Sequence, residues 1–200
     1  MDIEKVILDG CKESDRRSQF KLYECCYPYL MSISLRYRQD ENEAASAVNI
    51  AFLKILNNIH LFDPGLPFKG WIRQIMIRTL IDEYRKQKKL NEQYQSGNYE
   101  KDIALNGIHV DYNEAESNLN VEELLGYIHR LNPLTSTVFN LFVLDGYSHK
   151  DIGELINITE SASKWHLFTA RKQLQDLVSV SIDRKKPTLI PTLKISTYEK

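Results

Sequence analysis

The sequence has few of the residues that mark disulfide-rich or zinc-binding proteins. Its 200 residues include three cysteines, and Cys11, Cys25 and Cys26 are adjacent or far apart, without a CxxC pair. A disulfide framework or a cysteine-based zinc site is therefore not expected, and we predict that the three thiols are buried structural side chains. Eight Gly and six Pro are also few, which favours a helical chain with few turns.

Long apolar runs are missing as well. No stretch of 18 consecutive apolar residues occurs, so we expect no helix that spans a membrane. Residues 1–17 contain acids near their start and no long apolar core, so we do not expect a signal peptide. The chain is accordingly expected to stay in the cytoplasm.

Sequence motifs of catalysis do not occur either. No Gly-rich phosphate-binding loop follows a predicted strand, and there is no HExxH motif. We therefore predict that the protein is not an enzyme and uses no catalytic residue, cofactor or metal. The histidines are scattered singly, as surface or capping residues would be, at His60, His109, His129, His149 and His166.

What the sequence does contain is a helical pattern in an ordinary globular composition. Hydrophobic residues make up 42% of the chain and charged residues 26%, and the net charge is −1. No internal repeat or strand pair is visible, so we predict an all-α fold. The first predicted helices cover residues 2–11, 15–38, 42–60 and 68–89. Pro28 is expected to break or kink the second of them.

The core of this first half is expected along the apolar faces of its helices. Residues that recur three or four positions apart lie on one face of a helix and can pack inward together. The residues so placed are Phe20, Tyr23, Leu30, Ile33, Tyr37, Ala45, Val48, Phe52, Ile55 and Ile59.

Residues 133–174 have the pattern of three helices, the last two joined by a tight turn. Gly146 accepts the left-handed conformation that ends a helix, and Ser148 and Thr159 are predicted helix caps. Two helices, a short turn and a polar outer face form a helix-turn-helix, which favours DNA binding over a plain helical bundle. In the last helix the predicted buried residues are Ser163, Leu167, Ala170 and Leu174, and the predicted outer residues are Ser161, Lys164, Trp165, His166, Phe168, Thr169 and Lys172.

The composition changes between these two halves. Residues 91–120 are acidic and lack a sustained apolar period, so they are predicted to form a flexible linker, either a plain tether or a segment that occupies a basic channel. The tail at 181–200 has two Pro and is predicted to be disordered or to order on a partner. The predicted domains are therefore residues 1–90 and 121–180.

Residues 68–89 are strongly basic, with seven Lys and Arg against two acids. Phe68, Trp71 and Tyr84 are interleaved with these cations. Aromatic rings stack on unpaired bases and cations bind phosphates, so this pattern suits single-stranded nucleic acid. The alternative is a solvated basic helix, and for Trp71 itself we favour packing in the core.

Four stretches resemble, in order and spacing, the extracytoplasmic-function sigma factors of bacterial RNA polymerase. The first half contains FKLYECCYPYLMSISLRY, NEAASAVNIAFLKILNNIHLF and FKGWIRQIMIRTLIDEYRKQKK, and the second contains GYSHKDIGELINIT. The resemblance covers residues 15–90 and 121–178. It implies two small all-α domains similar to sigma regions 2 and 4, in a transcription initiation factor that directs core RNA polymerase to promoters and aids their opening.

The resemblance also implies partners and contact residues. The partners are promoter DNA and core RNA polymerase, contacted at the clamp of its largest subunit and at its flap region. The helix at 68–89 would recognise and melt the minus-ten element, the linker would thread toward the active-site cleft and RNA exit channel, and the helix-turn-helix would bind the minus-thirty-five element. The implied polymerase-binding residues are Glu43, Ser46, Asn49, Ile50 and Leu53. The implied DNA-binding residues are Arg73, Arg78, Arg85, Lys86, Lys88, Lys89, Ser161, Lys164, Trp165, His166, Thr169 and Lys172.

The sequence departs from the family pattern at several contact positions. Arg78 takes the place of an Asn in the minus-ten helix, and Trp165 replaces a small polar residue in the recognition helix. Because Arg, Lys, Asn and Gln read base edges best, the recognition helix indicates weak promoter reading. In the clamp-binding helix, the positions that carry acids and Gln-Glu in the family are Ala45, Ser46, Asn49 and Ile50.

These departures leave two hypotheses open. In one, the sigma-like factor is recruited by another DNA-bound protein, through Trp165 and Phe168 or through the tail around Leu189, Ile190 and Leu193. In the other, it is an ordinary sigma factor with an unusual promoter. The alternative function is a helix-turn-helix regulator that acts without entering the polymerase, and an anti-sigma protein is a further candidate partner.

Overall fold

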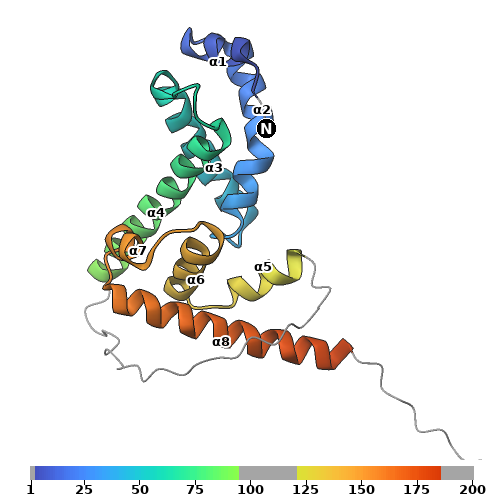
Figure 1. Ribbon diagram of the computed structural model, residues 1–200, viewed down its shortest axis with the longest axis vertical. Helices are drawn as coiled ribbons and strands as arrows, with labels where there is room; N and C mark the ends of the chain where they lie inside the picture. Colours follow the sequence, from blue (N-terminus) through green and yellow to red (C-terminus); the bar gives the residue numbers. More distant parts are fainter. Residues whose placement is uncertain (1–2, 95–120, 186–200) are drawn as a thin grey trace, which may run out of the picture.

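The computed structural model describes residues 3–94 and 121–185, and every regular element within these two ranges is helical. The predicted all-α fold is confirmed. One group of helices precedes the gap in the described residues and a second group follows it (Figure 1). The predicted linker and C-terminal tail lie largely outside the described residues.

Four α-helices and one short 3-10 turn form the first half. They are α1 (Lys5–Lys12), α2 (Arg16–Ser34), α3 (Glu41–Asn58), η1 (Ile59–Leu61) and α4 (Phe68–Tyr94). Aspartates begin two of the helices. The carboxylate of Asp15 accepts a hydrogen bond from the Ser18 backbone N–H at 2.8 Å, and that of Asp40 accepts one from Glu43 at 2.9 Å. Such caps satisfy backbone donors that have no partner within the helix.

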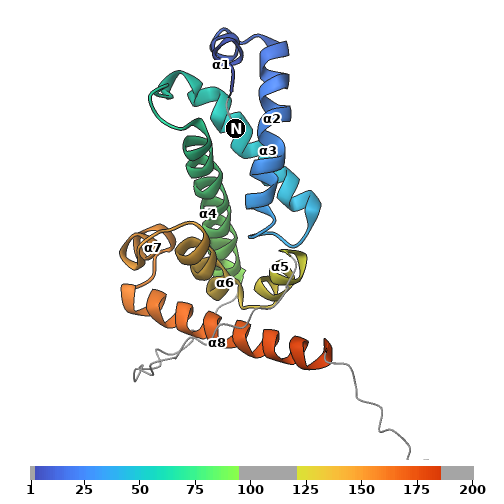
Figure 2. The same cartoon turned by 45° about the vertical axis from the view of Figure 1, so that its right-hand side comes forward.

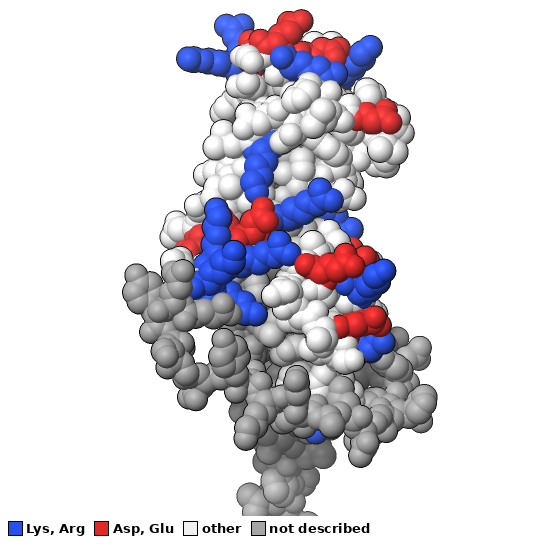
Figure 3. Space-filling view, turned by 90° about the vertical axis from the view of Figure 1, so that its left-hand side faces the viewer, with Lys and Arg blue, Asp and Glu red and all other residues white. Residues whose placement is uncertain are grey.

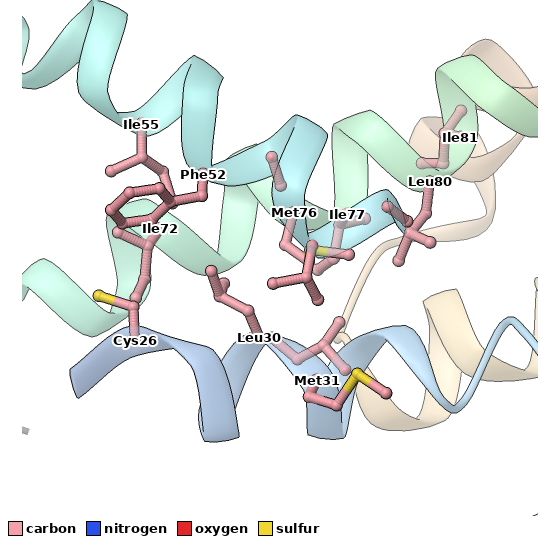
Figure 4. Close-up of a cluster of buried hydrophobic side chains, with 14 of the residues drawn as sticks. Cys26, Leu30, Met31, Phe52, Ile55, Ile72, Met76, Ile77, Leu80 and Ile81 are labelled. Carbon is pink, nitrogen blue, oxygen red and sulfur yellow. The ribbon is translucent and has the colours of Figure 1, made fainter. Parts of the chain in front are cut away.

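Helices α2, α3 and α4 pack around a shared apolar core (Figure 4). Leu30 of α2, Ile55 of α3 and both Ile72 and Met76 of α4 are 0% exposed. Burying a side chain of this size stabilises the fold by about 1.5–3 kcal/mol. Because the core fixes the rotation of each helix, it also determines which faces of α3 and α4 remain on the surface.

Helix α2 differs from the prediction in two details. Phe20 is not a core residue, since its side chain is 61% exposed and Leu22 is 0% exposed. The buried stripe of α2 runs through Leu22, Cys26 and Leu30 at intervals of four, and Phe20 lies to one side of that stripe. Pro28 does not break the helix, because it lies on the exposed side, where water can bond the carbonyl that loses its helical partner.

The cysteines match the prediction only in part. Cys11 and Cys26 are buried, whereas Cys25 is exposed. Consecutive residues point about 100° apart around a helix, so two adjacent side chains cannot both face the same core. Burial raises the pKa of the Cys26 thiol to about 12, which keeps this thiol protonated and unreactive at neutral pH.

The second half contains the predicted helix-turn-helix. Its elements are α5 (Val121–His129), α6 (Pro133–Phe139), the π-turn η2 (Asn140–Leu144), α7 (His149–Ile156) and α8 (Glu160–Lys185). Gly146 has a φ of 78°, as a left-handed helix end requires. Ser148 and Asp151 form a reciprocal capping box, and the Thr159 hydroxyl accepts from the Ala162 N–H at 3.0 Å.

The predicted buried face of α8 is confirmed. Ser163, Leu167, Ala170 and Leu174 are all buried. The polar ring of His149 is fixed against this face, stacked on Phe142 at 4.3 Å between ring centroids and with Nδ1 2.9 Å from the Ser163 hydroxyl. Burial lowers the pKa of His149, and nearby Lys164 lowers it further.

The two halves pack directly against each other. Figures 1 and 2 both show α6 and α7 beside the C-terminal part of α4, with α8 crossing beneath them. Val138, Leu141 and Ile152 of the second half belong to the same buried apolar cluster as the core of α2, α3 and α4. Because buried residues of both halves belong to one apolar cluster, the packing does not mark where one domain ends and the next begins. The predicted domain boundaries therefore stay a prediction.

Candidate nucleic-acid and polymerase interfaces

The five polymerase-binding candidates lie on the outer face of α3. Glu43, Ser46, Asn49, Ile50 and Leu53 are all exposed, Ile50 by 40% and Leu53 by 60%. The opposite face of the helix is buried against α2 and α4. Residues three positions apart are neighbours on a helix surface, so Ile50 and Leu53 form a small apolar patch on this solvent face.

The basic side of α4 is also on the outside of the molecule. Arg78, Arg85, Lys86 and Lys89 are exposed, and Lys88 is half-buried. Figure 3 views the side on which α4 and α7 lie, and Lys and Arg gather there with a few acids between them. The structure thus brings together the α4 cations that the sequence singled out, with the exception of Arg73, which is described below.

The two acids of this stretch of α4 are paired with cations from neighbouring elements. Lys54 Nζ lies 3.1 Å from a carboxylate oxygen of Asp82, and Arg38 Nη2 lies 3.1 Å from one of Glu83. Their negative charge is therefore offset locally. The positive charge of the exposed α4 cations remains available to an anionic partner.

Three aromatic rings pack together at the start of α4. The ring centroids of Phe62 and Phe68 are 5.0 Å apart, and Trp71 lies 5.3 Å from the first and 5.7 Å from the second. Phe62 and Phe68 are buried and Trp71 is half-buried. The ring of Trp71 thus packs mainly within the protein, as favoured from the sequence.

The outer face of α8 presents most of the predicted base-reading residues. Ser161, Lys164 and Lys172 are exposed, and Trp165 and Thr169 are half-buried. The Lys164 ammonium lies 2.6 Å from the carboxylate of Glu160, one helical turn earlier, with both side chains more than half exposed. Because the pair is exposed, it holds Lys164 only weakly and leaves it free to exchange partners.

His166 is the one predicted base-reading residue that the structure places elsewhere. Its side chain is 8% exposed, and its Nδ1 lies 3.0 Å from the Thr135 hydroxyl of α6. The prediction that it lies on the outer face is wrong. The sequence already held the signal, because residue 166 follows Ser163 by three and precedes Ala170 by four, which is the spacing of one helix face.

Arg73 is bound by a buried carboxylate that the sequence reasoning missed. The side chain of Asp145, at the end of η2, is 0% exposed. Its Oδ1 lies 2.9 Å from Arg73 Nη2 and 3.2 Å from Arg36 Nη2, and its Oδ2 accepts a hydrogen bond from the Tyr37 hydroxyl at 2.5 Å. Arg73 also donates to the Leu144 carbonyl at 2.6 Å. One acid of the second half is therefore held by three residues of the first.

Burial and the charge of Asp145 shift the pKa values of Tyr37 and Arg73. Burial raises the pKa of the Tyr37 hydroxyl well above its ordinary value, and the charge and hydrogen bond of Asp145 raise it further. Burial alone would lower the pKa of Arg73, but the hydrogen bond and charge of Asp145 outweigh that effect and raise it. Both Tyr37 and Arg73 therefore keep their protons at neutral pH.

Further hydrogen bonds join the halves around this cluster. The buried Asn140 amide donates to the Arg36 carbonyl at 2.7 Å, and Gln39 donates to the His129 carbonyl at 2.6 Å. The His129 ring lies 2.7 Å from the Leu35 carbonyl. At the far end of α4, Arg85 donates to the Glu154 carbonyl at 3.0 Å.

The described part of the chain contains neither a membrane-spanning helix nor a metal-binding cluster. Within residues 3–94 and 121–185, no helix is long and apolar enough to cross a membrane. The same part of the chain holds no group of three or more His, Cys, Asp or Glu placed to bind a metal ion.

Two family models match the chain. The model described as Sigma-70 region 2 matches residues 22–90, and the model described as Sigma-70, region 4 matches residues 122–174. These ranges contain the α3 face and the basic side of α4 in the first case, and the helix-turn-helix in the second. The order of the two matches is the order of the two halves.

Two known sigma factors are similar to most of the chain. The ECF RNA polymerase sigma factor SigM of Bacillus subtilis (strain 168) is 26% identical over 157 residues, which cover 78% of this chain and 90% of that protein. A solved structure, the sigma factor RpoE in complex with the anti-sigma factor NepR from Bartonella quintana, has a similar fold. Its TM-score is 0.50 at 17% identity, covering 80% of this chain and 96% of that one.

Proposed function

Since the chain belongs to the sigma-70 family of RNA polymerase sigma factors, as a divergent member of the extracytoplasmic-function type, we propose a division of work between its two halves. The protein is a transcription initiation factor that directs RNA polymerase to promoters. In our proposal the α3 face binds the clamp of the largest subunit, the basic side of α4 contacts and opens the minus-ten element, and α8 reads the minus-thirty-five element. A regulator that never enters the polymerase is not favoured, because its first half would not match region 2.

The observation that carries this proposal is the exposed apolar patch of Ile50 and Leu53 beside the basic side of α4. A protein-binding patch and a nucleic-acid-binding surface on adjacent helices suit a factor that must hold polymerase and DNA together. Ile50 stands at a position where the family usually has an exposed Glu, so the docking surface of this chain is more apolar. We propose that this surface matches a correspondingly apolar area of the clamp, and that α8 lies near the flap region.

The role of the α3 face is tested by Ile50→Arg. Loss of an apolar contact of this size costs about 1.5–3 kcal/mol, so binding to core polymerase should weaken roughly 10- to 100-fold. The measurement is co-purification with core enzyme and a titration of the complex, together with helical content by circular dichroism. The matched control is Val6→Arg, which places the same charge on an apolar residue of α1 that is 77% exposed. If Ile50→Arg binds core polymerase as tightly as the control, the α3 face is not the docking surface.

Partners beyond the polymerase are also proposed. Sigma factors are initiation factors rather than enzymes, and we propose that this chain likewise catalyses no reaction and acts in the cytoplasm, where the polymerase is. The solved relative from Bartonella quintana is bound to an anti-sigma factor, and we propose a protein of that class as a regulator of this chain. A recruiting DNA-bound protein remains a proposal that depends on how well α8 reads bases alone.

The exposed residues of α8 bear on that last question. Lys164 and Lys172 can hold phosphates, which position a helix without specifying a sequence. With His166 buried, the other predicted base-reading residues that remain at the surface are Ser161 and parts of Trp165 and Thr169. A smaller base-reading set favours weaker sequence discrimination at the minus-thirty-five element than the sequence alone indicated.

Selection of promoters from a random DNA library, with only this protein and core polymerase, measures that discrimination. We expect a recovered minus-thirty-five element with low information content, since each good base contact contributes about 1–3 kcal/mol of discrimination and few are available. A sharp two-element consensus would show that α8 reads bases well and that no recruiting protein is needed. The same selection with the Trp165→Ala variant is the matched comparison, because Trp165 is the largest side chain on this face of α8.

A further inference from the structure

The interface between the two halves is organised around a single buried charge. The Asp145 carboxylate has no exposure and is contacted by Arg36, Tyr37 and Arg73, all from the first half. A carboxylate removed from water is tolerated only when cations and hydrogen-bond donors replace the lost hydration. The first half supplies two cations and a hydroxyl for this purpose, so the site is built rather than incidental.

We propose that Asp145 is a latch that holds the free factor in a closed form and withholds part of its DNA-binding surface. This inference rests on the proposed function of α4. In the closed form the Arg73 guanidinium is bound to the Asp145 carboxylate and to the Leu144 carbonyl. A carboxylate and a phosphate offer a guanidinium similar oxygen atoms, so Asp145 occupies the position that a DNA phosphate would take.

A second cation of the same helix is engaged by the other half. Arg85 donates to the Glu154 carbonyl of α7 at 3.0 Å, twelve residues along α4 from Arg73. These two residues lie more than three turns apart along α4, so the second half is bonded to the helix at two separate points. DNA that follows the basic side of α4 must therefore displace the second half at both points.

The closed form is specific but not optimised for stability. Arg36 Nε and Asn140 Oδ1 are buried without a hydrogen-bond partner in the described part of the chain. Each unsatisfied buried group disfavours the closed form, and the desolvation cost of a buried ion pair offsets much of its attraction. Because these unsatisfied groups weaken the closed form, a partner that binds only the open form can shift the protein to it.

The latch is tested with Asp145→Asn in the full chain, without polymerase. The closed form is expected to open, giving a radius of gyration clearly above that of the wild-type protein measured under the same conditions. If at least nine-tenths of the wild-type protein is closed, binding of the free factor to promoter DNA with a premelted minus-ten region should tighten about tenfold or more. X-ray scattering and a fluorescence titration give the two readouts.

Two further variants make the result decisive. Asp176→Asn removes the same charge from an exposed position of α8 and should change neither the size nor the DNA affinity. Tyr37→Phe removes only the hydroxyl that binds Asp145 and keeps the ring, so it should open the factor in part and remains informative if Asp145→Asn fails to fold. If Asp145→Asn, or Tyr37→Phe in its place, has the size and DNA affinity of the wild type, the latch does not exist.

The same experiments separate this inference from the proposed function. If the variants open and bind DNA more tightly, the latch is supported whatever polymerase does. If they open but bind the premelted DNA no better, the withheld surface is not on α4, and the latch is overturned as a control of DNA binding. Normal transcription by the reconstituted wild-type holoenzyme would still support the sigma-factor function in that case.

Discussion

Replacing five cations of α4 by Ala should abolish promoter opening while the factor still binds core polymerase. The variant changes Arg78, Arg85, Lys86, Lys88 and Lys89. Each phosphate contact contributes about 0.9 units to the log–log slope of binding against salt on duplex DNA, so five contacts account for about 4 to 5 units. Permanganate reactivity of thymines around the minus-ten element on a supercoiled promoter should fall to background. Because α3 is unchanged, the holoenzyme should still form.

The matched control removes the same charge elsewhere in the first half. Lys5, Lys12, Arg16, Arg17 and Lys21 are exposed cations of α1 and α2. Their joint replacement by Ala lowers the net charge equally, and Ala favours helix at each position. If the two variants melt the promoter equally well, the basic side of α4 is a solvated surface rather than a nucleic-acid interface. If both fail equally, net charge rather than position governs opening.

Local features of this fold follow from the sequence because they depend on neighbouring residues. Ser148 and Asp151 are three positions apart and form the capping box, and Gly146 takes the positive φ that ends a helix. The buried stripe of α8 follows directly from helical periodicity. Phe20 was predicted to be buried and His166 to be exposed, and both were assigned to the wrong face of their helix. In each case the spacing to the buried neighbours was already present in the sequence.

The interface between the halves, in contrast, depends on contacts between residues that are far apart in the sequence. Asp145 is bound by Arg73, 72 residues away, and by Tyr37, 108 residues away. Nothing in the residues around Asp145 distinguishes it from an ordinary acid before a helix-ending glycine. Such a contact depends on how two completed helical units dock, and a periodicity argument does not reach it. The sequence therefore indicated Arg73 only as a DNA contact and did not reveal that its guanidinium is bound to Asp145.

The exposure of the faces proposed for docking was predictable because exposure follows from the same periodicity as burial. The outer face of α3 contains Ile50 and Leu53, which fall between the buried positions Val48, Ala51 and Ile55. A single exposed apolar side chain is common on protein surfaces, but two neighbouring ones form a patch that another molecule can cover. The sequence cannot say which molecule binds there, because that depends on a surface the partner supplies.

Two leucines of the first half distinguish a side chain that stabilises the fold from one that is proposed to bind the polymerase. Leu30→Ala should lower the free energy of unfolding by about 2–5 kcal/mol, because Leu30 is 0% exposed and its removal leaves a cavity between α2, α3 and α4. For a chain of this size that corresponds to a fall in Tm of about 5–20 °C. Thermal unfolding followed by circular dichroism measures it.

Leu53→Ala makes the same chemical change on the surface of α3. Leu53 is 60% exposed, so the variant should unfold within about 0.5 kcal/mol of the wild type. Its binding to core polymerase should nonetheless weaken, since the side chain lost is part of the proposed docking patch. Leu30→Ala, measured well below its own Tm, should bind the polymerase normally. If instead Leu53→Ala destabilises the fold as much as Leu30→Ala, then α3 is packed differently from the arrangement described, and the exposed patch on which the docking proposal depends is not present in solution.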